Sequence, residues 1–213
     1  MDTATPAVTV ALHDGSAVVA DVSAVDARRH GELLSAFLDE ALRKAGAGFG
    51  DLTAIAVGIG PGPYTGLRAG VVTAVVLGSA LRIRTDGICS LDVIAAAQAG
   101  RGDSGPADFL VVTDARRREV YWARYRSGGE RVAGPLVSRP ADLPAGLPVA
   151  GEAGLLPAEL TSRVLEPRYP SAAVLADLAV ARLQAGLPPE LAEPLYLRRP
   201  DAREPGPPKR VTR

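Results

Sequence analysis

An uncharged apolar run, residues 69–81, directly follows a glycine-rich segment, and the pair limits how this chain can fold. The run has thirteen residues, whereas a membrane-spanning helix needs about twenty. Large apolar side chains occur on every side of a helix at residues 66–81, which is typical of a helix buried all round. We therefore expect a sheet on one side of this helix and a second helix on the other.

Small residues recur at every fourth position of this helix and so share one of its faces. They are Gly66, Gly70, Ala74 and Gly78. A stripe of small side chains lets another helix approach closely. The approaching helix belongs either to the same chain or to a partner protein, and the spacing is compatible with both.

The glycine-rich segment, residues 58–68 (GIGPGPYTGLR), joins a predicted buried strand at residues 52–57 to this helix. Backbone N–H groups at a helix start can bind phosphate. The candidate residues of such a nucleotide or phosphate loop are Gly60, Gly62, Thr65 and Arg68. The segment lacks the Gly-Lys-Ser/Thr of a Walker A loop and the glycine spacing of a dinucleotide fingerprint. The glycines can equally serve only to form a tight turn, and both interpretations stay open.

Strand-like and helix-like patterns alternate along the rest of the chain. An Asp-Gly pair at residues 14–15 predicts a hairpin, and a turn-rich segment at residues 101–106 predicts a domain boundary. Strands are predicted at 8–12, 17–22, 82–86, 109–114, 119–126 and 131–137, and helices at 29–44, 90–98 and 171–184. This order predicts an α/β protein with two subdomains, residues 1–100 and 101–197, and a basic flexible tail at 198–213.

Charge and rare residues exclude several classes of function. The 24 basic residues are balanced by 24 acidic ones, which disfavours broad nucleic-acid binding because phosphates require a clustered positive surface. One cysteine, Cys89, and two histidines, His13 and His30, leave almost nothing for a nitrogen- or sulfur-rich metal site. The first twenty residues lack the apolar core of a secretion signal. We expect a cytoplasmic protein without a membrane segment or a metal.

Four stretches together resemble one known family. Residues 56–68 (AVGIGPGPYTGLR) are similar to the signature of the TsaB, or YeaZ, family. Residues 2–5 (DTAT), residues 112–125 (VTDARRREVYWARY) and residues 194–198 (PLYLR) agree with the family in the same order. His30 stands where the family has a histidine that opens its first helix.

The resemblance implies an actin-like (ASKHA) fold of two RNase H-like subdomains with mixed sheets. It also implies a non-catalytic subunit of the machinery that makes threonylcarbamoyladenosine at position 37 of tRNAs reading ANN codons. The catalytic paralogue TsaD holds the metal and transfers the threonylcarbamoyl group, and the ATPase TsaE joins the assembly. ATP and metal then belong to the partners, this chain has no cofactor of its own, and tRNA contacts it only indirectly.

The family's partner surface lies on its first two helices, which are residues 29–44 and 66–81 here. The same surface forms a homodimer when the protein is alone. The resemblance therefore places a partner interface at His30, Leu33, Leu34, Phe37, Gly66, Gly70, Ala74 and Gly78.

A competing interpretation is an autonomous ASKHA-type nucleotide phosphotransferase or hydrolase that uses the Gly60–Gly66 loop. Ala4 stands where the phosphate loop of such kinases usually has glycine, and residues 114–116 (DAR) lack the glycines of a second phosphate loop. The chain also departs from the family, because the DTAT motif should end a central strand. About four to six apolar residues of that strand are expected before Met1, since its neighbours would otherwise lose ladder hydrogen bonds. We expect the true start upstream of Met1.

Overall fold

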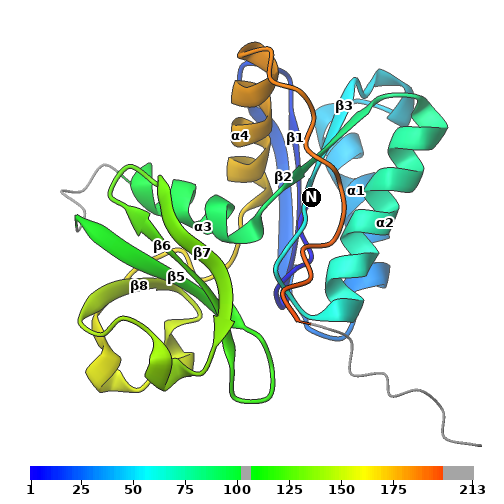
Figure 1. Cartoon of the computed structure of the whole chain (residues 1–213). Coiled ribbons are helices and arrows are strands. Elements are labelled where there is room, and N and C mark those ends of the chain that lie inside the picture. Colours follow the sequence, from blue (N-terminus) through cyan, green and yellow to red (C-terminus); the bar gives the residue numbers. More distant parts are fainter. Residues whose placement is uncertain (102–106, 199–213) are drawn as a thin grey trace, which may run out of the picture.

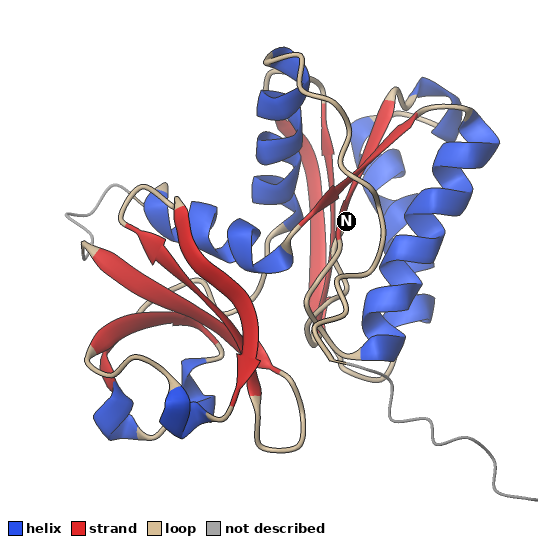
Figure 2. Ribbon diagram, in the orientation of Figure 1, coloured by secondary structure: helices blue, strands red, loops and turns tan. Residues whose placement is uncertain are grey.

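The computed structural model describes residues 1–101 and 107–198 and arranges them in two lobes (Figure 1). The helices are α1 (His30–Ala45), α2 (Tyr64–Leu81), α3 (Ser90–Ala99) and α4 (Ala172–Gln184). The strands are β1 (Ala7–His13), β2 (Val18–Val25), β3 (Ala54–Gly58), β4 (Arg84–Ile88), β5 (Asp108–Asp114), β6 (Val120–Arg126), β7 (Arg131–Ser138), β8 (Leu147–Gly151) and β9 (Thr161–Val164). Figure 2 shows helices and strands mixed in both lobes.

The first lobe is a layer of strands between helices. β1 and β2 pair antiparallel around the Asp-Gly turn, as predicted, and β3 and β4 pair parallel. The first two residues of the chain lie between these two pairs, because Asp2 bridges to Thr9 and the Gly58 N–H donates to the Met1 carbonyl at 2.9 Å. Helices α1 and α2 cover one face of the layer and α4 the other (Figure 1).

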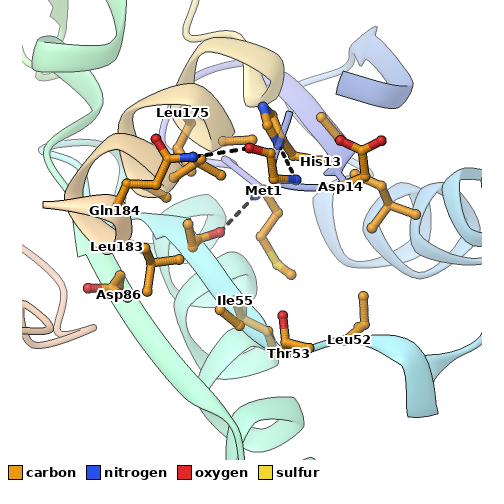
Figure 3. A pocket seen from close by; sticks show the side chains of 18 of the residues that line it. Met1, His13, Asp14, Leu52, Thr53, Ile55, Asp86, Leu175, Leu183 and Gln184 are labelled. Atoms are coloured by element: carbon orange, nitrogen blue, oxygen red, sulfur yellow. Dashed lines mark hydrogen bonds between the residues drawn. The ribbon is translucent and has the colours of Figure 1, made fainter. Parts of the chain in front are cut away.

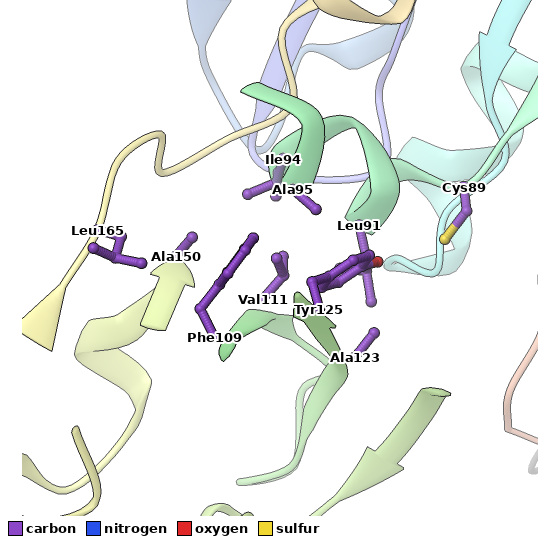
Figure 4. Packing of buried hydrophobic residues seen from close by; sticks show 10 residues of the cluster. All are labelled: Cys89, Leu91, Ile94, Ala95, Phe109, Val111, Ala123, Tyr125, Ala150 and Leu165. Carbon is purple, nitrogen blue, oxygen red and sulfur yellow. The ribbon is translucent and has the colours of Figure 1, made fainter. Parts of the chain in front are cut away.

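The second lobe is built on one mixed sheet with the strand order β7-β6-β5-β8-β9. Its central strand β5 pairs antiparallel with β6 and parallel with β8. Phe109 and Tyr125 stack in the core of this lobe with ring centroids 5.7 Å apart, and Leu91 and Ile94 of α3 pack over them (Figure 4). The predicted α/β class with mixed sheets is confirmed.

Two helices cross the predicted boundary between the subdomains. α3 was expected in the first subdomain, but its Leu91, Ile94 and Ala95 belong to the core of the second sheet. α4 comes late in the chain, yet its Leu175 and Ala179 pack toward Ile88 and Ala56 of the first lobe. A linear cut at residue 100 therefore does not separate the two cores. Of the predicted tail only Arg198 lies within the described residues, and most of the 101–106 boundary segment lies outside them.

Candidate functional site: the glycine loop and the outer face of its helix

The glycine loop between β3 and α2 is packed closely against the start of the chain. A Cβ at Gly62 would lie 2.0 Å from the Ala4 carbonyl oxygen, and one at Gly58 would lie 1.8 Å from the Asp2 carboxylate. Gly60 has a φ of +89°, which favours glycine. Gly62 is therefore required by the backbone that crosses the loop at Ala4, Gly58 by the Asp2 side chain, and Gly60 by its own backbone conformation.

A buried hydrogen-bond network holds this crossing together. The Ser90 hydroxyl donates to Asp2 Oδ2 at 2.6 Å, and the Ala4 N–H donates to Asp2 Oδ1 at 2.7 Å. The Gly60 N–H donates to Ser90 Oγ at 3.2 Å, and the Ser90 N–H donates to the Gly60 carbonyl at 2.8 Å. Burial raises the pKa of Asp2 above its ordinary value. The Asp2 carboxyl is 1% exposed and serves as a structural acceptor within the fold.

Two other candidate loop residues lie at the start of α2. The Arg68 guanidinium stacks 3.9 Å from the centre of the Tyr64 ring, and its Nε donates to the Tyr196 hydroxyl at 2.7 Å. The Tyr64 and Tyr196 rings stack at 5.6 Å. Thr65 lines a cavity of about 430 Å³ together with His30 and Arg116. These contacts favour the structural interpretation of the loop, and phosphate binding at Gly60, Gly62, Thr65 and Arg68 stays a prediction.

The stripe of small residues on α2 faces the chain's own strands. The Gly70 N–H donates to Thr3 Oγ1 at 3.0 Å, and the Thr3 hydroxyl donates to the Gly66 carbonyl at 2.7 Å. A Cβ at Gly78 would lie 2.0 Å from Thr85 Oγ1. All four stripe residues, Gly66, Gly70, Ala74 and Gly78, are buried in the described chain. Their expected place in a partner interface is therefore corrected, because Thr3, His30 and Thr85 of the same chain occupy the space that a partner helix would need.

The candidate interface residues of α1 also face inward to differing degrees. Leu34 is buried in the core under the β1–β2 hairpin, and Leu33 and Phe37 pack partly buried against that core. His30 Nε2 lies 2.9 Å from the Thr5 carbonyl oxygen, which ties the start of α1 to the start of the chain. The predicted interface role of Leu34 is corrected for the same reason as that of the stripe, because Leu34 is buried. His30, Leu33 and Phe37 are partly accessible.

The face of α2 opposite the stripe carries exposed valines that sequence reasoning did not select. Val72, Val75 and Val76 are 56%, 45% and 59% exposed. Beside them, a groove of about 260 Å³ runs between the two helices. Its lining residues are Gly31, Ser35, Leu38, Asp39, Phe49, Thr73 and Leu77. The signal was present in the sequence, because in a helix that is apolar all round the face opposite the small residues is the next to consider.

Neither metal nor thiol chemistry has an evident place in the described residues. Within residues 1–101 and 107–198, no group of three or more His, Cys, Asp or Glu side chains could hold a metal ion.

One described helix, α2, is long and apolar enough to cross a membrane by length and composition alone. The buried third of α2 packs on Ile55 and Val57 of β3 in the first-lobe core.

Cys89 is expected to resist alkylation in the folded protein. Burial raises the pKa of its thiol to about 11, and the thiolate is the reactive form. At pH 8, iodoacetamide should label Cys89 at least about tenfold more slowly in the native protein than in denaturant. Mass spectrometry of the labelled chain measures this ratio, and equal rates would show that the thiol is open to solvent.

Comparisons with the sequences of known proteins place this chain in a family. An uncharacterized protein of Mycobacterium tuberculosis is 47% identical over 95% of this chain and 92% of its own length. The tRNA threonylcarbamoyladenosine biosynthesis protein TsaB of Escherichia coli is 33% identical over 59% of this chain and 53% of its own length. A family model described as "TsaD: tRNA N6-adenosine threonylcarbamoyltransferase" matches residues 18–160, more than half of the chain. The chain belongs to the TsaB (YeaZ) family.

Solved structures of the family show the same fold. YeaZ from Pseudomonas aeruginosa superimposes with a TM-score of 0.73 at 28% identity, covering 92% of this chain and 97% of that one. The actin-like fold implied by the sequence is thereby confirmed. The TsaB family takes part in tRNA threonylcarbamoyladenosine biosynthesis.

Proposed function

We propose that this TsaB-family chain is a non-catalytic subunit that supports threonylcarbamoyl transfer to adenosine 37 of tRNAs reading ANN codons. It works with TsaD and TsaE in the cytoplasm, while ATP, metal and direct tRNA contact belong to those partners. One observation carries the proposal: the exposed valines Val72, Val75 and Val76 on the outer face of α2. Contiguous exposed apolar side chains mark interaction sites in folded proteins.

The shape of this face suits a partner helix. The groove between α1 and α2 runs beside the exposed valines and has apolar walls at Leu38 and Leu77. A helix lying in a hydrophobic groove is a common mode of recognition. In the absence of TsaD, a second copy of the same chain would cover the same valines and form a homodimer.

The loop geometry supports the non-catalytic part of the proposal. An autonomous phosphotransferase needs an accessible acid and open backbone N–H groups near the transferred phosphate. Here the Asp2 carboxyl is buried, and the Gly60 N–H is bonded to Ser90. Calorimetry with ATP and magnesium tests the alternative, because tight binding with turnover by the isolated chain would favour the enzyme.

The variant Val72→Asp/Val76→Asp is expected to lose partner binding. Two carboxylates placed in an apolar contact would have to be desolvated without a partner charge. We expect at least a tenfold loss of co-elution with TsaD, and a matching loss of threonylcarbamoyladenosine on tRNA in a reaction with TsaD, TsaE and threonylcarbamoyl-adenylate. Mass spectrometry of digested tRNA measures the product.

The matched control is Val164→Asp, because Val164 is 65% exposed on β9 of the second lobe, away from α2. This variant should bind TsaD and support modification like the parent. Circular dichroism and thermal melting check that both variants fold. Normal TsaD binding by a folded Val72→Asp/Val76→Asp variant would place the interface elsewhere.

A further inference from the structure

The exposed valines of α2 lie between two grooves. Toward α1 is the groove of about 260 Å³, to which α2 contributes Thr73 and Leu77. A second groove, of about 430 Å³, lies between α2 and residues 189–193, which follow α4 (Figure 1). Val75 and Gly78 form its α2 side. Positions 73 and 75 are about 200° apart around a helix, so the two grooves lie on opposite sides of the valines.

The segment after α4 gives the second groove an apolar wall. Leu191 is 74% exposed and lines the groove together with Ile83 and Val75. The Gly87 N–H of β4 donates to the Glu190 carbonyl at 3.1 Å. A Cβ at Gly87 would lie 2.4 Å from the Leu191 carbonyl oxygen, so the segment runs directly against the strand. The second groove is therefore a fixed part of the first lobe.

The charged side chains that line the two grooves are all acidic. Asp39 of α1 lines the first groove, and Glu190 and Glu193 line the second. Glu190 pairs with Arg182 at 2.9 Å, whereas neither Asp39 nor Glu193 forms an ion pair within residues 1–101 and 107–198. We call these three carboxylates the acidic rim. Exposed carboxylates carry a negative charge at neutral pH.

Positive charge along α2 lies only at its two ends. Arg68 stacks on Tyr64 and donates to Tyr196, and Arg82 directly follows the last residue of the helix. Neither arginine lines a groove. The chain has no net charge, so the negative character is local to the rim. A helix is about 10 Å wide and the Debye length is about 10 Å in 0.1 M salt, so the rim acts on any partner that covers the valines.

We propose that the acidic rim selects a protein partner whose apolar stripe is flanked by lysine or arginine side chains, and that it weakens pairing with a second copy of this chain. The inference rests on the proposed interface at the α2 valines. Symmetric pairing uses the same patch on both copies, so rim would meet rim and like charges would repel. A partner with basic flanks brings opposite charges together. The phosphates of a nucleic acid would be repelled as a second copy is.

The first test measures self-association of the chain with no partner present. Analytical ultracentrifugation compares the parent with Asp39→Asn/Glu193→Gln in about 0.05 M and about 0.5 M NaCl. The dimer Kd of the parent should fall at least about fivefold at the higher salt, because screening removes the repulsion. At the lower salt the neutralised variant should dimerise at least about fivefold more tightly than the parent. Its Kd should change less than about twofold with salt.

The second test measures attraction, with TsaD as the probe. Biolayer interferometry gives the association rate constant at the same two salt concentrations. The rate constant of the parent should fall at least about tenfold at the higher salt, because opposite charges steer association and salt screens them. At the lower salt Asp39→Asn/Glu193→Gln should associate at least about fivefold more slowly than the parent.

The matched control is Asp142→Asn/Glu159→Gln, which removes the same two charges from exposed positions of the second lobe. It should behave like the parent in both tests. Self-association that neutralising the rim leaves unchanged would overturn the proposal, as would TsaD association that is equally fast or faster in the rim variant. A parent chain that does not bind TsaD would instead contradict the proposed function, and self-association would still decide on the rim.

Discussion

Replacing Gly62 with alanine is expected to lower the free energy of unfolding by about 3 kcal/mol, at the upper end of what overpacking costs. The added Cβ would lie 2.0 Å from the Ala4 carbonyl oxygen and 2.8 Å from its carbonyl carbon. These are backbone atoms, so no flexible side chain can move aside. The crossing segment is itself held by the bonds of Met1 and Asp2 to β1 and β3. Denaturant unfolding followed by circular dichroism measures the loss.

Gly31→Ala is the matched control for Gly62→Ala. Gly31 lies in the first turn of α1, and a Cβ there meets nothing within 4 Å. Alanine is the better helix former, by up to about 1 kcal/mol in a helix interior. The control should therefore be as stable as the parent or slightly more stable. Equal stability of Gly62→Ala and Gly31→Ala would contradict the close crossing of backbone over the loop.

Local patterns in the sequence predicted most of the elements, because those elements depend on neighbours along the chain. The Asp-Gly pair at residues 14–15 fixes the hairpin. The apolar spacing of residues 29–44 predicts α1, which spans His30–Ala45. β9 (Thr161–Val164) was missed, since its four residues are mostly exposed and carry no alternating pattern.

Tertiary placement could not be read from the same patterns. The spacing of Gly66, Gly70, Ala74 and Gly78 correctly indicates one tightly packed face, but it does not say what approaches that face. In the structure the approach is made by Thr3 near the start of the chain and by Thr85 of β4, and His30 at the start of α1 lies beside Gly66. The same limit applies to α4, whose apolar face meets the first lobe although its sequence position follows the second sheet.

The corrected orientation of α2 changes which residues define the candidate site. With its small face on the chain's own strands, α2 presents Val72, Val75 and Val76 outward. An α2 that is apolar all round thus has two roles: one face holds the start of the chain and the other remains open. Larger side chains in the buried stripe would destabilise the lobe, whereas substituting the exposed valines tests an interface without touching the core.

The chain beginning at Met1 is expected to lose about 2–3 kcal/mol of stability as the pH falls from 8 to 6, at about 1.4 kcal/mol for each unit of pKa difference. Burial lowers the pKa of the Met1 amino group from 8.0 to about 6. Above pH 8 the amine is neutral in the folded and unfolded chains, and its burial costs nothing. Between pH 8 and 6 the unfolded chain binds the proton and the folded chain does not. Protonation therefore stabilises the unfolded state relative to the folded state. Below pH 6 both are protonated and the loss is complete.

Acetylation of the Met1 amine is the control, because it removes this titration and keeps the rest of the chain. Met1 lines a cavity of about 440 Å³ (Figure 3), whose other ionisable groups are His13, Asp14, Asp51 and Asp86, and Asp2 adjoins the amine. Their contributions are common to both forms, so the difference between the two unfolding curves isolates the amine. Urea unfolding at pH 6, 7 and 8 should show the two forms diverging as the pH falls, with the acetylated chain the more stable at pH 6. A constant difference across this range would mean that the amine is open to solvent and that Met1 does not occupy a strand position between β1 and β3.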